Sequence, residues 1–276
     1  GTMVKKEIVA KRLNSEEGIS YTEFSYQILQ GLDYLELNRQ YGCALQTGGS
    51  DQWGNLTSGT ELIRKVEGKT VHAIGTPLIT NSDGTKFGKS EGNAIWLNPQ
   101  MCSPYAFYQF WLNTADADVV DRLKVFTFLT RAEIGEYEHK VETEAYKREA
   151  QKRLAYEVTA LVHGVEATHQ AIAASEALFG KGDFAALDES TLQAVMSELP
   201  SVELSSDQLD LITVLTELGF ASSKSEARRI LKEGGASVNG AKVQGEDAVI
   251  TPEQLLHGKY AIVRRGKKNQ GAITVV

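Results

Sequence analysis

The chain has 276 residues, of which 42% are hydrophobic and 24% charged, and its formal net charge is −7. This length allows two or three domains, since single domains run to roughly 100–200 residues. The composition is that of a soluble globular protein, and no apolar run approaches the roughly 18 residues of a membrane helix, so we expect no membrane partner. Cys43 and Cys102 lack metal or redox spacing, and the chain starts without an apolar signal region, which predicts reduced thiols in the cytoplasm.

Charge is unevenly distributed along the chain. Residues 132–208 carry 6 Lys and Arg against 15 Asp and Glu, a net −9. Residues 222–276 carry 10 against 5, a net +5. This asymmetry predicts a basic module joined to an acidic body, so the overall negative charge does not exclude a nucleic-acid partner.

Helical and extended patterns alternate in the first hundred residues. The predicted elements are a helix over 20–37, a short buried strand over 43–46, a helix over 55–67 that stops at Gly68, and extended segments over 71–74 and 77–80. This alternation is typical of half of an α/β sheet domain and is too short for a whole one.

The remaining residues change from a helical to a β-rich pattern. Apolar residues recur at helical spacing from Pro104 to about Ala174, which predicts a helical domain. Gly182, Pro200 and the pair Ser205-Ser206 indicate a linker over 181–208. Beyond it, two short helices and several β-rich segments are expected. The predicted domains are therefore 4–99, 100–180 and 209–276, with 181–208 as the linker.

One face of the predicted helix 20–37 is polar. At 100° per residue, Tyr26, Gln30 and Asp33 fall within about 60° of one another. The opposite side is expected to form the core, with Phe24, Ile28 and Leu35. A phenol, an amide and a carboxylate can together bind an ammonium and a hydroxyl group, which suits an amino-acid ligand. An ordinary solvated face is the alternative.

A glycine turn lies between the predicted strand and the next helix. The decapeptide Gln46–Asn55 reads QTGGSDQWGN. In this strand, turn and helix order, the backbone can approach a ligand closely and a carboxylate can accept hydrogen bonds from ribose hydroxyls. The pattern is not the dinucleotide-binding fingerprint, and a tight connection packed by Trp53 is the alternative.

Two lysines lie three residues apart in the segment Lys86-Phe87-Gly88-Lys89-Ser90, which follows the turn signal of residues 81–84. Paired cations on such a loop can neutralise the charge that develops on a triphosphate as pyrophosphate leaves. From spacing alone, a solvated hairpin loop is the alternative.

The basic module contains two groups of cations. Lys224, Arg228 and Lys232 recur at four-residue spacing, so they would present a line of positive charge to a phosphate backbone, and Arg229 flanks them. A second basic edge is expected in a turn that contains Arg264, Arg265, Lys267 and Lys268. A solvated helix face is again the alternative.

These motifs together resemble the bacterial tyrosyl-tRNA synthetase family of class I. The resemblance is carried by Tyr21–Tyr26 with Gln30 and Asp33, by Gly48–Asn55, and by Lys86–Ser90, which is similar to the second class I signature. Residues 209–276 resemble the small RNA-binding domain first known from ribosomal protein S-four, through the run 222–235 and Val238-Asn239-Gly240. The implied fold combines α/β and α+β domains: an incomplete Rossmann-like half-sheet, a helical anticodon-binding domain and an S-four-type domain.

The resemblance also implies a role for each motif. Tyr26 and Gln30 would bind the tyrosine ammonium and Asp33 the phenolic hydroxyl, while Gln46 would support the pocket. Gln52 would contact the tyrosine carboxylate. Lys86 and Lys89 would bind the pyrophosphate in the transition state, as the catalytic pair. The implied ATP-binding residues are Lys86, Lys89, Ser90, Gly49 and Asp51, the last through the ribose. The implied substrates are tyrosine, ATP with Mg²⁺ and tRNA(Tyr), with no tightly bound cofactor and no protein metal site, and a homodimer is possible.

One family motif is absent. None of the five histidines lies in the His-x-Gly-His context of the first class I signature. We therefore expect the chain to begin after that signature, to be inactive alone in forming tyrosyl-adenylate, and to bind tRNA weakly. Residues 4–99 are expected to self-associate or to be partly disordered, because missing strands would expose apolar edges. An RNA-binding protein with a vestigial synthetase segment is the alternative function, while the terminal RNA-binding module disfavours a tryptophanyl relative.

Overall fold

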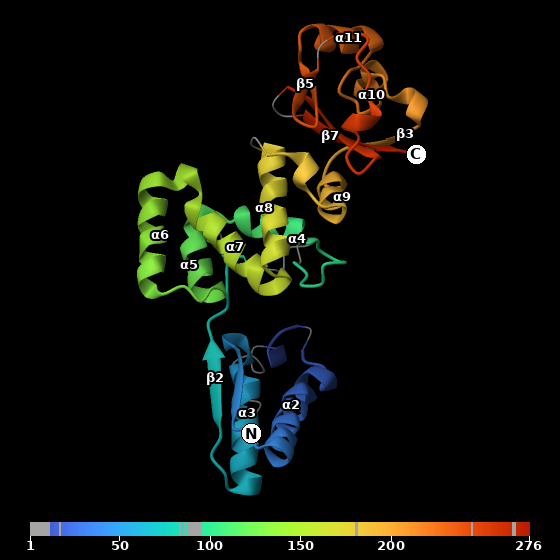
Figure 1. The fold of residues 1–276 in the computed structure, drawn as a ribbon. Helices are drawn as coiled ribbons and strands as arrows, with labels where there is room; N and C mark the ends of the chain where they lie inside the picture. Colours follow the sequence, from blue (N-terminus) through green and yellow to red (C-terminus); the bar gives the residue numbers. More distant parts are fainter. Residues whose placement is uncertain are drawn as a thin grey trace. The chain divides into compact units, whose positions relative to one another are not determined.

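The computed structural model describes residues 12–16, 18–82, 84, 85, 87, 95–179, 182–243, 245–266 and 269–276. The chain divides into two compact units, residues 1–90 and 91–276. In Figure 1 the first unit runs from blue to cyan and the second from green to red. The first unit alternates helices and strands, and the second passes from helices to a sheet, in the order that the sequence patterns predict.

The longer elements among the described residues of the first unit are two helices and a two-stranded parallel sheet. Its elements are α2 (Tyr21–Tyr41), β1 (Leu45–Gly49), the short 3₁₀ helix η1 (Ser50–Gln52), α3 (Trp53–Glu67) and β2 (His72–Thr76). The two strands pair from Leu45 with His72 to Gly49 with Thr76. Gly68 ends α3 with a φ of 67°, the left-handed conformation that glycine adopts without steric cost.

Helices α2 and α3 pack closely because glycines lie at their contact. A Cβ on Gly31 would lie 3.6 Å from the Gly59 backbone, so the two helices approach almost without intervening side chains. Tyr34, Leu35 and Ile63 form most of the small core around this contact.

The predicted core side of α2 is only partly correct. Leu35 is buried, but Ile28 is 52% exposed and Phe24 is half-buried. The physical reason is the close glycine contact with α3, which turns Gln27, Gly31 and Tyr34 inward in place of Ile28.

The two-stranded sheet is exposed on one face. Leu45 and Ile74, whose side chains lie on the same face, are each about half-exposed. The expected buried strand over 43–46 is therefore wrong in position and in burial: β1 begins at Leu45, and only one of its faces packs on α3. Parallel sheets are normally covered on both faces, so this face is unusual for its class.

Five α-helices form the first part of the second unit. They are α4 (Pro104–Leu112), α5 (Asp116–Phe126), α6 (Arg131–Glu144), α7 (Glu149–His163) and α8 (Val165–Phe179). Helix α7 packs against the other four (Figure 1). Local sequence fixes the helix starts: the Ser103 side chain accepts from the backbone N–H of Ala106, and Thr130 forms a capping box with Glu133. Phe107, Leu123 and Leu154 are fully buried between the helices.

A mixed sheet with two covering helices completes the second unit. Its strand order is β3-β7-β6-β4-β5, with β3 and β7 parallel and the other pairs antiparallel. The strands are β3 (Ser201–Leu204), β4 (Ala236–Val238), β5 (Ala241–Val243), β6 (Tyr260–Arg265) and β7 (Asn269–Val275), and the helices are α10 (Leu211–Glu217) and α11 (Lys224–Lys232). Leu211, Leu215 and Leu231 are fully buried against the sheet.

The segment 181–208, expected to be a linker, is folded over its described residues. It contains α9 (Glu189–Ser197), with Leu192 and Val195 fully buried, and strand β3, which extends the C-terminal sheet. The glycine that suggested a flexible break has a packing role: a Cβ on Gly182 would lie 2.5 Å from the backbone nitrogen of Ala177. The sheet of the C-terminal module therefore begins at Ser201, before the predicted boundary at residue 209.

Candidate functional site

The polar row predicted on the first helix lies on α2. Tyr26 and Asp33 are exposed and Gln30 is half-buried. None of these three side chains forms a hydrogen bond or ion pair with another described residue. Their phenol, amide and carboxylate groups are therefore available to a ligand on this side of the helix.

The glycine turn after β1 holds a carboxylate against the backbone. A Cβ at Gly49 would lie 2.7 Å from Asp51 Oδ1 and 3.0 Å from Leu78 Cδ2, so a larger residue there would displace one or both of these side chains. Asp51 itself is exposed. Gln52 is half-buried, and its Oε1 accepts a hydrogen bond from Asn55 Nδ2 at 2.9 Å. The turn thus presents one exposed carboxylate beside a stretch of backbone without side chains.

A buried glutamine links the polar row to this turn. Gln27 is 4% exposed, and its Nε2 donates to the Gly54 carbonyl oxygen at 2.6 Å. Ser58 Oγ donates to the Gln27 carbonyl oxygen at 3.1 Å, which ties the same turn of α2 to α3. Because Gln27 follows Tyr26 directly, these bonds fix the first residue of the row relative to the start of α3.

Sequence reasoning missed Gln27. Its position on the helical wheel is the one sequence feature that pointed to it. Gln27 lies beside the polar row, between the polar and the apolar sides of the helix, so periodicity assigns it to neither side. Gln27 Oε1 and Gln46 Oε1 are buried and lack a hydrogen-bond partner among the described residues. Buried acceptors of this kind normally bind water or a ligand donor, which marks the area around both glutamines as a polar site.

The lysine residues of the predicted triphosphate loop, Lys86 and Lys89, and the neighbouring Ser90 lie outside the described residues. Of the turn before them, residues 81, 82 and 84 are described. Asn81 N donates to the Thr85 carbonyl at 2.8 Å, and Gly84 adopts a φ of 83°. Phe87 N then donates to the Ile79 carbonyl at 3.1 Å, so the chain reverses direction between these residues.

Helix α11 carries the first predicted row of cations. Its inner side is formed by Ala227, Ile230 and Leu231, which are buried. The exposed cations on its outer side are Lys224, Arg228, Arg229 and Lys232. Ser223 caps the helix by accepting from Glu226 N at 3.2 Å. The local sequence therefore separates a core face from a cationic face, as the four-residue spacing predicts.

The two arginines of the second predicted basic edge have partners within the protein. Arg264 Nη2 donates to the carbonyl oxygen of Leu178 at 2.7 Å, near the C-terminal end of α8. Arg265 donates to the Phe220 carbonyl and pairs with Glu226 Oε1 at 3.0 Å. Both are half-buried. Lys267 and Lys268 lie outside the described residues.

The carboxylate of Glu226 binds both Ser222 and Arg265 in this module. Its carboxylate accepts from the side chain of Ser222 at 2.6 Å and from the backbone of the same residue at 2.8 Å. These two bonds, with the charge of Arg265 as a smaller contribution, lower the pKa of Glu226 to about 2. The carboxylate is thus ionised at neutral pH and holds Arg265 against α11.

The described residues contain neither a candidate metal site nor a candidate membrane span. In that part of the chain, no group of three or more His, Cys, Asp or Glu side chains is arranged to hold a metal ion. No helix there is long and apolar enough to cross a bilayer.

Comparison with protein families gives two matches that together span most of the chain. A family described as "tRNA synthetases class I (W and Y)" matches residues 1–180. A second, described as "Tyrosine--tRNA ligase SYY-like C-terminal domain", matches residues 191–273. The second match begins within α9, in agreement with the folded character of that segment.

Individual proteins agree with the family matches. The chain is 62% identical over 276 residues to the tyrosine–tRNA ligase of Leifsonia xyli subsp. xyli and 57% identical over 274 residues to that of Streptomyces avermitilis. It covers 62% and 65% of these two proteins, so it spans less than two thirds of their length.

A solved structure also matches. A C-terminally truncated mitochondrial tyrosyl-tRNA synthetase of Aspergillus nidulans superimposes with a TM-score of 0.53 at 33% identity. The match covers 62% of this chain and 49% of that one.

Proposed function

The chain belongs to the class I tRNA synthetase family of the tryptophan and tyrosine enzymes, and we propose that it is part of a tyrosine:tRNA ligase. Such an enzyme uses ATP to activate tyrosine and transfers it to tRNA(Tyr). Tyrosine is favoured over tryptophan because the C-terminal match is to a domain of tyrosine ligases and because Asp33 offers an exposed carboxylate to a phenolic hydroxyl.

The observation that carries this proposal is the direct link between α2 and the glycine turn. The bond from Gln27 to Gly54 joins the helix bearing Tyr26 and Asp33 to the start of α3, which directly follows the turn bearing Asp51. Tyrosine would bind along the helix through Tyr26, Gln30 and Asp33, with Gln46 and Gln52 near the amino-acid backbone. The ribose of ATP would meet Asp51 beside Gly49, where the backbone is bare.

The loop after Ile79 would bind the phosphates of ATP. Lys86 and Lys89, with Ser90, would neutralise the triphosphate of ATP, which enters as its magnesium complex, as pyrophosphate leaves. The role is electrostatic and requires no proton transfer.

We also propose that this chain holds one half of the tyrosine site and that another polypeptide segment holds the other. The exposed face of the β1–β2 sheet supports this, since Leu45 and Ile74 would be covered in a complete parallel sheet. The first class I signature, absent from these 276 residues, would lie on that segment. Alone, the chain would be inactive in adenylate formation, and the same apolar face would favour self-association or a homodimer.

The helical domain and the C-terminal module would bind the tRNA. The exposed cations of α11 can contact phosphates, which positions RNA without reading its bases. Among these cations, Arg228 is the one that we expect to contact a phosphate most directly. It lies in the middle of the row and has no partner among the described residues. Cys43 and Cys102 are free thiols, as suits a reducing cytoplasm where tRNA is charged.

Tyrosine-dependent pyrophosphate exchange tests the proposal. The chain alone should give no exchange above background, and addition of the remaining segment of the Leifsonia ligase should restore it. Restored exchange that Lys89→Ala abolishes would support the proposal. Exchange that responds to tryptophan and not to tyrosine would contradict it.

A second candidate function is RNA binding with a vestigial synthetase segment. The separation of charge favours it, because the cationic face of α11 is complete within this chain and the tyrosine site is not. It predicts tRNA binding without any restored exchange in the complementation experiment.

A further inference from the structure

Helix α9 lies between the helical part of the second unit and the C-terminal module in the sequence, and it contacts both. It packs against α4 and α8, and in Figure 1 it lies beside α8 and leads into β3. Its residues Leu192 and Val195 are fully buried, yet neither belongs to the apolar core of the module. The helix is therefore anchored in the helical part.

A polar cluster connects α9 to strand β6 of the module. Glu189 Oε1 accepts a hydrogen bond from the Tyr260 hydroxyl at 3.1 Å and pairs with Lys259 Nζ at 2.9 Å. Gln193, one helical turn after Glu189, donates from Nε2 to the same hydroxyl at 2.6 Å. We call these four residues, Glu189, Gln193, Lys259 and Tyr260, the α9 latch.

Strand β6 is buried on both of its faces. Ala261 and Val263 belong to the apolar core of the module. The alternating residues Tyr260 and Ile262 lie outside that core and are nevertheless 5% and 1% exposed. Because the Tyr260 hydroxyl contacts α9, this second face is the one directed toward the helix.

The buried tyrosine distinguishes the α9 latch from an ordinary surface ion pair. The side chains of Lys259 and Glu189 are almost half-exposed, and such a pair contributes little by itself. A buried phenol ring adds apolar contact, and its hydroxyl requires partners within the protein. Both partners of the Tyr260 hydroxyl are on α9.

The turn before β6 also contacts the segment that leads into α9. His257 adopts a φ of 49°, which is uncommon for a residue with a Cβ, and Gly258 follows with a φ of 75°. His257 Nε2 donates to the Leu187 carbonyl oxygen at 2.9 Å, two residues before α9 begins. The turn thus directs three consecutive features of the module, this imidazole and the two latch residues after Gly258, toward α9.

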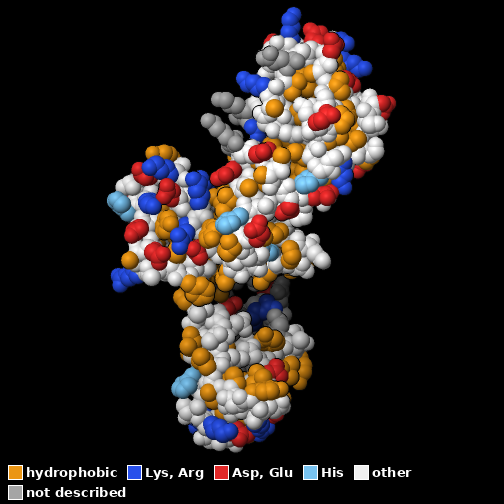
Figure 2. Space-filling model, viewed as in Figure 1, with side chains coloured by type: hydrophobic (Ala, Val, Ile, Leu, Met, Phe, Trp, Pro, Cys, Tyr) orange, Lys and Arg blue, Asp and Glu red, His pale blue; other side chains and the backbone are white. Residues whose placement is uncertain are grey.

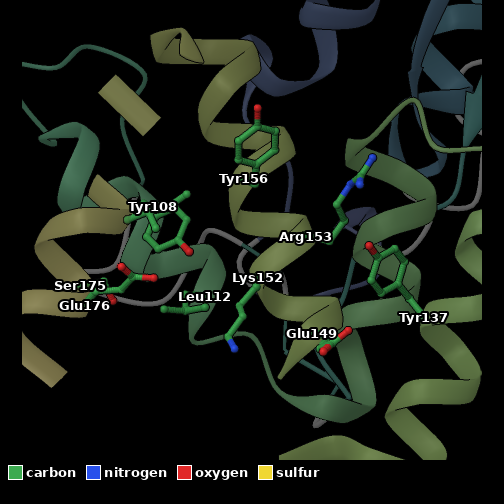
Figure 3. Close-up of a pocket in the computed structure, with 10 residues that line it drawn as sticks. Tyr108, Leu112, Tyr137, Glu149, Lys152, Arg153, Tyr156, Ser175 and Glu176 are labelled. Carbon is green, nitrogen blue, oxygen red and sulfur yellow. The ribbon is translucent and has the colours of Figure 1, made fainter. Parts of the chain in front are cut away.

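A second contact holds the end of α8. Arg264 of β6 and Gln270 of β7 both donate to the Leu178 carbonyl oxygen, at 2.7 and 2.8 Å. Other residues of α8 have a different environment, since Ser175 and Glu176 line a hollow of about 470 Å³ between α4, α6, α7 and α8 (Figure 3). The module therefore binds the last turn of α8 and leaves the hollow open.

From these contacts we propose that the α9 latch is a positioning group, which holds the C-terminal module in one orientation on the helical part. Figure 2 shows Lys and Arg side chains over the end of the module that carries α11. The latch residues are not on α11, so they act on RNA by orienting that cationic face. A module that is already oriented loses less freedom when it binds. This inference rests on the proposed tRNA-binding function.

A distance measurement between two spin labels tests the orientation in the full chain. The labels are attached through Glu138→Cys on α6 and Lys242→Cys on β5, both exposed positions, after Cys43 and Cys102 are replaced by serine. With the α9 latch intact, the distribution of distances should have one narrow peak.

Charge reversal breaks the α9 latch and charge exchange restores it. Glu189→Lys places two ammonium groups at the Tyr260 hydroxyl and should broaden the distribution. Glu189→Lys combined with Lys259→Glu brings opposite charges together again and should narrow it, which separates release of the module from misfolding. Glu166→Lys is the matched control, because Glu166 is an exposed acid in the first turn of α8 and forms no ion pair with a described residue.

Filter binding of a tRNA(Tyr) transcript connects the orientation to RNA. The Kd should rise by the reciprocal of the docked fraction, so that a docked fraction of about one tenth weakens binding about tenfold. The slope of log affinity against log salt should equal that of Glu166→Lys, which carries the same change in net charge, because the cations of α11 are retained.

Four outcomes would overturn the inference. They are a broad distribution with the α9 latch intact, a narrow one in Glu189→Lys, no recovery on charge exchange, and broadening that leaves the tRNA Kd unchanged. If the unchanged chain does not bind tRNA, the proposed function fails and the positioning role fails with it. Failure of the α9 latch alone appears in the distances while tRNA binding by the unchanged chain persists.

Discussion

The ring of Tyr34 lies against Gly59, so that a Cβ at residue 59 would come within 2.8 Å of Tyr34 Cδ1. Tyr34 is 1% exposed, and its hydroxyl donates to the His72 carbonyl oxygen at 3.0 Å. One side chain thus connects α2 to both α3 and β2. The first unit has a small core, so this contact carries much of its packing.

Gly59→Ala should therefore destabilise the first unit. The added methyl group must displace the Tyr34 ring, an overpacking effect that typically costs about 1–3 kcal/mol in the free energy of unfolding. Hydrogen exchange of the backbone amides in α2 and α3 measures this loss of stability. It reports on the first unit alone, which is needed because the two units need not unfold together.

Gly135→Ala is the matched control for that substitution. Gly135 lies inside α6 and a Cβ there meets nothing within 4 Å, so alanine should stabilise the helix by about 0.5–1 kcal/mol. Equal protection of α2 amides in Gly59→Ala and in the unchanged chain would show that Tyr34 moves aside without cost.

The stability of the C-terminal module should depend on pH through Glu226. Its folded pKa is about 2, below the ordinary value of 4.5, because the folded state favours the carboxylate. Its contribution to stability is complete above about pH 4.5 and is lost as the pH falls toward 2. Glu226→Gln should reduce this acid dependence in chemical-denaturation curves of the module. Glu233→Gln, an exposed change at the other end of α11, should leave it unaltered.

Two arginines of the basic module should respond differently to substitution. Arg228→Ala should weaken tRNA binding and reduce the slope of log affinity against log salt by about one, because one phosphate contact is lost. Arg264→Ala should leave that slope almost unchanged and instead increase amide exchange at the end of α8, where its guanidinium binds Leu178. A salt slope that falls equally in both variants would place Arg264 on the RNA.

The elements with strong local signals were predictable from sequence. The end of α3 follows from Gly68, and the cationic face of α11 follows from four-residue spacing around an apolar stripe. A turn signal at residues 81–84 precedes the lysine loop, and Gly84 N donates to the Asn81 carbonyl while Gly84 adopts a positive φ. Each of these features is decided within a few residues of the chain.

Features that depend on distant contacts were not predictable in the same way. The buried side of α2 is set by the contact of Gly31 with Gly59, which periodicity does not reveal. Gly182 and Pro200 suggested a break, but Gly182 lies tightly against the end of α8, and the Pro200 carbonyl accepts from Ala272 N as part of the sheet. Arg264 and Arg265 suggested free cations because their carbonyl partners are far away in the sequence.

The same limit applies to the candidate site. The polar row on α2 and the glycine turn could be found from residue types and spacing. The bond from Gln27 to Gly54 that connects them joins residues 27 positions apart and appears only in the structure.

The most direct test of the proposed tyrosine site measures amino-acid discrimination by Asp33. In the complemented enzyme, kcat/KM for pyrophosphate exchange is compared between tyrosine and phenylalanine, with Glu36→Gln as the control on the same helix. Asp33→Ala should lower the preference for tyrosine roughly 10- to 150-fold, the effect of losing one hydrogen bond to a charged group, with phenylalanine almost unaffected. An unchanged preference in Asp33→Ala would contradict the assignment of this face of α2 to tyrosine.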